Sequence, residues 1–121
     1  MINFEVEYDD DGKIIDFLTN KLMSKNPEEV VRQKFLKILH YEYKYRKELL
    51  RAEVPVFHGS KELRDSRNNP IRADIVVYNT KTAAANRDQG NINFIVECKA
   101  PNVNEGYNLN IPMWRSRVSG L

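Results

Sequence analysis

The sequence has little cysteine and no long apolar run. Its single cysteine, Cys98, cannot form an intramolecular disulfide or a cysteine-based zinc site. No stretch reaches the roughly 18 apolar residues of a membrane-spanning helix. The first residues also lack the basic and apolar regions of a secretory signal. We therefore expect a cytoplasmic protein with no membrane association.

The composition predicts one globular domain over residues 1–121. The length of 121 residues is close to the commonest domain size, and the chain is 41% hydrophobic and 30% charged. The net charge of +2 is unevenly distributed, because residues 1–30 contain 8 acids and 3 bases whereas residues 31–72 contain 5 acids and 11 bases. A basic stretch favours a polyanionic partner, although a solvated helix face and loop would have the same composition.

Local patterns predict a hairpin followed by a helix. Within residues 1–22, apolar and polar residues alternate on both sides of a turn-forming Asp-Asp-Asp-Gly stretch at 9–12, which predicts an N-terminal hairpin. Asn26 as N-cap, Pro27 as the first helical residue and acids in the first turn predict a helix start. The helical spacing of apolar residues predicts that this helix ends between residues 39 and 43.

Period-two patterning predicts three strands after the helix. They are expected over residues 49–57, 72–78 and 92–99, which are rich in β-branched and aromatic residues. The polar segments between these strands predict connecting loops, over residues 58–70 and 80–91.

Three charged residues stand at the ends of apolar strands. Asp74 begins one apolar run, and Glu97 and Lys99 end another and share one face of their strand. Such charges are costly unless they are paired, reach water or bind a ligand. An interior ion pair is the plain structural explanation. The functional explanation is a metal-dependent phosphodiester site, in which two carboxylates on adjacent strands hold a hard cation and the lysine acts beside it.

Glu28 is a fourth candidate, on the predicted helix. It follows the three-and-four spacing of an apolar stripe that includes Val31 and Phe35, which predicts an inward-facing side chain, whereas Glu29 is predicted to point away. Glu28 would then be an outer ligand of a metal or its water. The alternative is that Glu28 only interacts favourably with the helix dipole.

Four strings occur in the order found in one family. They are Pro27-Glu28-Glu29-Val30-Val31-Arg32-Gln33, Glu53-Val54-Pro55-Val56, Arg72-Ala73-Asp74-Ile75-Val76-Val77 and Ile95-Val96-Glu97-Cys98-Lys99-Ala100-Pro101-Asn102. The sequence resembles the N-terminal nuclease domain of type I restriction enzyme R (motor) subunits, a branch of the PD-(D/E)xK nuclease superfamily. The resemblance covers roughly residues 24–104 and leaves residues 105–121 as a tail with no clear pattern.

The resemblance implies a fold and a chemistry. The fold would be α/β, a restriction-endonuclease-like mixed sheet with flanking helices, truncated after the Glu-x-Lys strand. The activity would be Mg²⁺-dependent hydrolysis of DNA, with Mn²⁺ as a substitute. Asp74, Glu97 and the Cys98 backbone carbonyl would bind the metal, Lys99 would position the attacking water, and Glu28 would assist from the helix.

The resemblance also implies partners. Double-stranded DNA would be the substrate, and methyltransferase and specificity subunits of a restriction complex would accompany the protein, one of them reading the target sequence. Basic residues of the middle segment are candidate phosphate contacts. They are Arg46, Lys47, Arg51, Lys61, Arg64, Arg67 and Arg72.

Two departures from the family pattern keep alternatives open. No Gly-x-x-x-x-Gly-Lys-Ser/Thr motif is present, so ATP would act only through an ATPase domain absent from this chain, and we expect a fragment of a larger R subunit. No glutamine follows Gln89, although the family usually has one on the helix after the Glu-x-Lys strand. One alternative is a non-catalytic DNA-binding or inter-subunit docking module of the same fold. Another is a stand-alone repair or defence nuclease.

Overall fold

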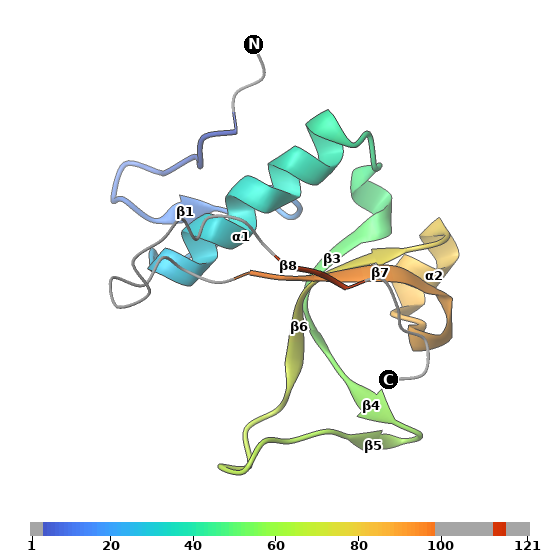
Figure 1. Ribbon diagram of the computed structural model, residues 1–121. Coiled ribbons are helices and arrows are strands. Elements are labelled where there is room, and N and C mark those ends of the chain that lie inside the picture. Colours follow the sequence, from blue (N-terminus) through green and yellow to red (C-terminus); the bar gives the residue numbers. More distant parts are fainter. Residues whose placement is uncertain (1–3, 99–112, 116–121) are drawn as a thin grey trace. The chain divides into compact units, whose positions relative to one another are not determined.

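The computed structural model describes residues 4–98 and 113–115, which belong to two compact units (Figure 1). The first unit contains the described residues up to Lys47, together with Cys98. The second contains residues 48–97 and 113–115. Helices and strands occur together in the chain, which confirms the predicted α/β class.

The first unit begins with the predicted hairpin turn. Tyr8 bridges Ile14 across the turn, and Gly12 adopts a φ of 84°, a left-handed conformation that costs glycine least. The Asp9 carboxylate accepts backbone hydrogen bonds from two residues of the turn. Strand β1 (Ile14–Ile15) then pairs with the antiparallel strand β2 (Leu22–Met23).

Helix α1 (Pro27–Lys37) confirms the predicted start of the helix. The Asn26 side chain accepts a hydrogen bond from the Glu29 backbone N–H at 2.8 Å, and the proline occupies the first turn, where no intrahelical donor is needed. The helix continues as a π-helical segment, η1 (Ile38–Glu42), so helical structure ends within the predicted range.

The second unit is built on a four-stranded sheet. After a 3₁₀ turn, η2 (Lys47–Leu49), strands β3 (Leu50–Pro55), β6 (Arg72–Tyr78), β7 (Ile92–Glu97) and β8 (Met113–Arg115) occur in the spatial order β3-β6-β7-β8. Every described pair in this sheet is antiparallel. The three predicted strands are present, whereas β8 falls in the segment for which the sequence shows no clear pattern.

The two predicted connecting loops are wrong in part, because each contains short regular elements. Residues 58–70 include most of a small hairpin, β4 (Phe57–His58) with β5 (Lys61–Glu62). Residues 80–91 include helix α2 (Lys81–Asn86) and a 3₁₀ turn, η3 (Gln89–Asn91). Elements of two to six residues are too short to show a reliable period in sequence.

The core of the second unit lies between α2 and one face of the sheet. Thr80 begins α2, because its hydroxyl accepts a hydrogen bond from the Ala83 N–H at 3.0 Å, and the small side chains of the helix then pack closely on β6. The helix lies beside the ends of β6 and β7 (Figure 1). The buried cluster consists of Val54, Ala73, Val76, Tyr78, Ala83, Ala84 and Ile95.

Tyr78 is a polar residue inside this apolar core. The residue is 1% exposed and lines a cavity of about 10 Å³, and within the described residues its hydroxyl makes no hydrogen bond. Burial raises the pKa of the Tyr78 hydroxyl above its usual value of 10.0, although the positive charges of Arg87 and Arg51 oppose this effect. The buried hydroxyl therefore lowers the free energy of unfolding of the protein.

Tyr78→Phe is expected to raise the free energy of unfolding by about 1 kcal/mol, since it removes a buried unsatisfied hydroxyl. It should also reduce the fall in the free energy of unfolding that the wild type shows at alkaline pH. Above pH about 10 the unfolded chain releases the phenolic proton while the folded chain retains it, so wild-type stability falls as pH rises. Urea denaturation at pH 7 and pH 10.5 measures both effects, with the exposed Tyr43→Phe as control. A loss of stability in Tyr78→Phe would contradict the prediction.

Candidate active site

Asp74 and Glu97 lie beside each other on neighbouring strands. Ile75 of β6 pairs with Val96 of β7, and the antiparallel register therefore sets Asp74 opposite Glu97 at the next position. Opposite residues in such a ladder have Cβ atoms about 5 Å apart. Both side chains are partly exposed, unlike the buried Ile75 and Val96. Two carboxylates thus stand together at the edge of an apolar core.

A third carboxylate extends this row on the other side of β6. Ala52 and Val54 of β3 pair with Ile75 and Ala73, so Glu53 lies opposite Asp74. The sequence pattern indicates no role for Glu53, although this residue lies within one of the family-like strings. None of the three acids lacks an interaction partner. The row Glu53–Asp74–Glu97 therefore combines acids from three strands.

The backbone is irregular where this row crosses β3. Glu53 has a φ of 51°, a conformation that costs a residue with a side chain roughly 1 kcal/mol or more. On β6, Ala73 and Val76 line the same small cavity, and Asp74, which lies between them in sequence, is partly exposed.

The remaining predicted metal-site groups are placed only in part. Cys98 directly follows β7 and is a buried free cysteine, 5% exposed. Lys99 lies outside the described residues. Across the part of the chain that the structure describes, no three His, Cys, Asp or Glu side chains converge as a preformed metal site. The row supplies oxygen ligands side by side, the donor type that Mg²⁺ prefers.

The predicted orientations of Glu28 and Glu29 are wrong. Glu28 is exposed, because it lies in the first turn of α1, beyond the neighbours that bury Val31 and Phe35. Glu29 is 4% exposed and pairs with Arg32, and its other oxygen accepts a hydrogen bond from Gln33 at 2.9 Å. Gln33 also donates to Asp16 at 2.7 Å, so the N-terminal hairpin segment covers this side of the helix.

Some of the residues predicted to contact phosphates interact with other groups of the protein, and the others are exposed without such an interaction. Lys47 lies over the Phe17 ring, with Nζ 3.9 Å from the centroid. Arg51 donates to the Leu50 carbonyl at 2.8 Å, and Arg64 pairs with Glu62 at 2.9 Å. The four other basic residues are exposed, and no side-chain hydrogen bond or ion pair engages them among the described residues. They are Arg46, Lys61, Arg67 and Arg72.

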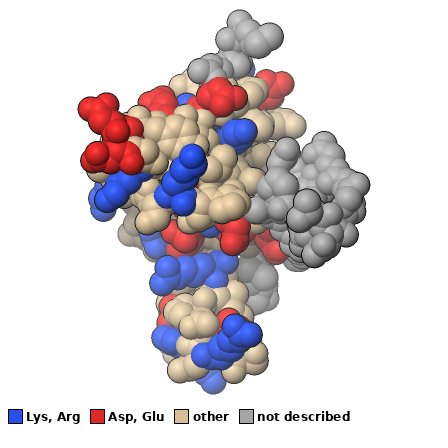
Figure 2. All heavy atoms as spheres, turned by 90° about the vertical axis from the view of Figure 1, so that its left-hand side faces the viewer, with Lys and Arg blue, Asp and Glu red and all other residues tan. Residues whose placement is uncertain are grey.

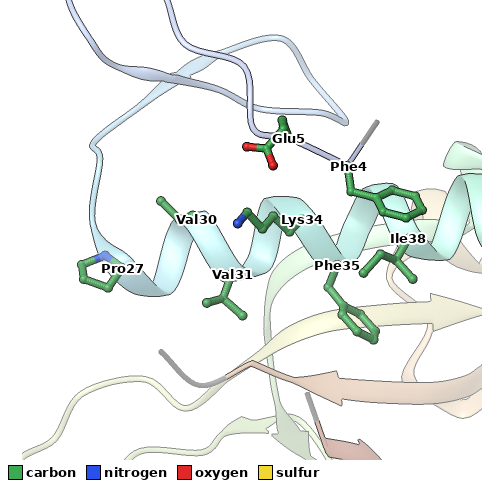
Figure 3. Close-up of a pocket in the computed structure, with 8 residues that line it drawn as sticks. All are labelled: Phe4, Glu5, Pro27, Val30, Val31, Lys34, Phe35 and Ile38. Atoms are coloured by element: carbon green, nitrogen blue, oxygen red, sulfur yellow. The ribbon is translucent and has the colours of Figure 1, made fainter. Parts of the chain in front are cut away.

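A separate apolar pocket of about 500 Å³ lies along α1 in the first unit (Figure 3). Phe4, Val31 and Phe35 contribute its apolar wall, and Lys34 and Glu5 contribute polar groups. None of its lining residues belongs to the row of acids. Of the helices in the described ranges, none has the length and apolar character to cross a membrane.

Comparison with known proteins identifies a family. The family model for the type I restriction enzyme R protein N terminus matches residues 27–110, which is well over half of the chain. The match includes both predicted carboxylate positions, Asp74 and Glu97. Searches among curated proteins and among solved structures found no match.

Proposed function

Because the chain belongs to the type I restriction enzyme R protein N-terminal family, we propose that it is a Mg²⁺-dependent DNA endonuclease domain. It would hydrolyse phosphodiester bonds without a sequence specificity of its own. The observation that carries this proposal is the position of Asp74 opposite Glu97 on adjacent strands of the sheet. Two carboxylates in this arrangement supply hard oxygen ligands for a divalent cation.

Each residue has a proposed role. Asp74, Glu97 and the Cys98 carbonyl would hold the metal ion. When bound, such an ion stabilises charge on the scissile phosphate and lowers the pKa of a bound water. We assign positioning of the attacking water to Lys99. The exposed carboxylate of Glu28 is assigned a supporting role from α1, which is compatible with its access to water at the start of the helix.

Double-stranded DNA is the proposed substrate, and the exposed arginines are the proposed first contacts with its phosphates. Arg51 and Arg64 are less suited to this task, because their guanidinium groups already bond within the second unit. Methyltransferase and specificity subunits are the proposed partners, and ATP would act through a separate ATPase domain. We place the complex in the cytoplasm, with no membrane contact.

Calorimetric titration with Mn²⁺ and Mg²⁺ tests the metal site directly. We expect saturable binding to the wild-type chain and its loss in both Asp74→Ala and Glu97→Ala, because each variant removes a ligand from the same ion. Glu48→Ala is the matched control, since this glutamate is exposed and lies just before β3.

The titration also separates the alternatives. Absence of a saturable site in the wild-type chain at millimolar metal would contradict the proposal and favour a non-catalytic DNA-binding or docking module. Saturable binding that survives in both variants would place the metal elsewhere. Binding without any DNA hydrolysis would leave the metal site in place and contradict the proposed activity of this chain.

A further inference from the structure

The connection between β3 and β6 is an ordered arm, which we define as residues 56–71. In Figure 1 it extends away from the sheet, with β4 and β5 at its far end. Three backbone hydrogen bonds of 2.9 to 3.1 Å close its base and join Val56, Leu63 and Ile71 to one another. The arm is therefore a folded element with its own hydrogen bonds.

A side-chain amide fastens the arm to the rest of the second unit. The Phe57 N–H donates to Gln89 Oε1 at 3.0 Å, and Gln89 Nε2 donates to the Phe57 carbonyl at 2.7 Å. This pair reproduces the two hydrogen bonds of a β-ladder with one glutamine. Its effect is to hold β4 against the turn that follows α2.

The second turn of the arm is ordered in detail. Asp65 Oδ1 accepts hydrogen bonds from the backbone N–H groups of Arg67 and Asn69, both at 2.9 Å. Arg64 donates to the Asn68 carbonyl at 2.9 Å and pairs with Glu62. Both acids of the arm accept hydrogen bonds from groups within it, and its three basic residues against two acids give the arm a net charge of +1.

The free positive groups of the arm are Lys61 and Arg67. Both are exposed, and no hydrogen bond or ion pair to another described residue engages either side chain. Among the charged side chains of the arm, Lys and Arg cover more of the visible surface than Asp and Glu in Figure 2, where the arm is the lowest part of the view. Ser60 precedes Lys61, and Ser66 and Asn68 flank Arg67 in sequence; such groups also donate hydrogen bonds to phosphate oxygens.

We propose that the arm is a preordered clamp for the phosphate backbone of duplex DNA, with Lys61 and Arg67 as its contacts. The proposal rests on the proposed function, since the nuclease site makes a polynucleotide the expected polyanion. The ordered arm presents Lys61 on β5 and Arg67 on its second turn without the entropy loss of fixing a mobile loop. The arm would supply affinity that is independent of sequence, while hydrolysis takes place at the acids of the sheet.

Fluorescence anisotropy with a labelled duplex, in a salt series without divalent metal, tests the clamp. The Lys61→Ala/Arg67→Ala variant should bind about tenfold or more weakly, and the slope of log K against log[salt] should be smaller in magnitude by about 2. Lys13→Ala/Lys21→Ala is the control, because it removes the same charge from two exposed lysines of the first unit. That control should keep the wild-type slope.

A third variant tests the ordering of the turn. Asp65→Ala adds one unit of positive charge and removes the bonds that hold Arg67 in place, so we expect weaker binding despite the gain in charge. Tighter binding of DNA by Asp65→Ala would contradict the proposal that the turn holds Arg67 in position.

Two further outcomes would contradict the clamp itself. If the arm variant and the lysine control lose the same affinity for DNA, the clamp is contradicted, while the metal titration can still support the nuclease. Failure of the wild-type chain to bind DNA would overturn the clamp, and a failed metal titration would contradict the nuclease site alone.

Discussion

Replacing Asp74 or Glu97 with the corresponding amide is expected to lower the rate of Mg²⁺-dependent DNA cleavage by about a thousandfold. The amide keeps the size of the side chain but removes the negative charge that holds the metal. Loss of the metal removes several kcal/mol of charge stabilisation in the transition state, and about 4 kcal/mol corresponds to this change in rate. Relaxation of supercoiled plasmid under single-turnover conditions measures it.

The matched controls for this prediction are exposed acids outside the row. Asp10→Asn and Glu48→Gln make the same chemical change at exposed positions and should retain the wild-type rate within about twofold. Circular dichroism of each variant establishes that the fold is kept. Cleavage by both Asp74→Asn and Glu97→Gln at the wild-type rate would mean that these acids are structural.

Glu29→Ala is expected to lower the free energy of unfolding by about 3 kcal/mol. The Glu29 carboxylate is 4% exposed and bonds to Arg32 and Gln33, which are themselves 7% and 1% exposed. Removing one member of a buried charged pair leaves the other buried with fewer partners, which is among the most destabilising single changes. The urea midpoint should fall by about 1 to 2 M, given ordinary m-values.

The neighbouring residue is the control, because Glu28 is exposed and bonds to none of this network. Glu28→Ala should change the free energy of unfolding by no more than about 0.5 kcal/mol. If Glu28 has its proposed supporting role, the same variant should cleave DNA more slowly at unchanged stability. Equal destabilisation by the two substitutions would show that burial does not distinguish them.

The parts of the fold that sequence analysis predicted correctly depend on local signals. The start of α1 follows from Asn26 and Pro27, and strands β3, β6 and β7 follow from apolar runs bounded by turn residues. Helix α2 was missed because six residues cannot show a helical period, although its cap, Thr80, was visible in the sequence. The short length of α2 therefore prevented its prediction, since six residues give too few positions in which to recognise a helical repeat of apolar side chains.

The candidate site depends on pairing between distant segments, which local patterns do not determine. The burial of Glu29 comes from Gln33 and Asp16, which are 17 residues apart in sequence. The position of Glu53 opposite Asp74 depends on the register of β3 with β6, and that register is set across the whole arm. Asp74 and Glu97 could be singled out because charges at the ends of apolar strands are unusual wherever those strands pair.

The closed base of the arm also bears on how the second unit folds. Strands β3 and β6 are distant along the chain, so their pairing requires the closure of a long loop, which costs conformational entropy and slows folding. The hydrogen bonds among Val56, Leu63 and Ile71 divide this connection into two smaller turns that can form first. Once Val56 and Ile71 are joined, Pro55 and Arg72 are already adjacent, and the register that aligns Glu53 with Asp74 is fixed. The hydrogen-bonded base of the arm is therefore one of the features that fix the register of the sheet that carries the acids.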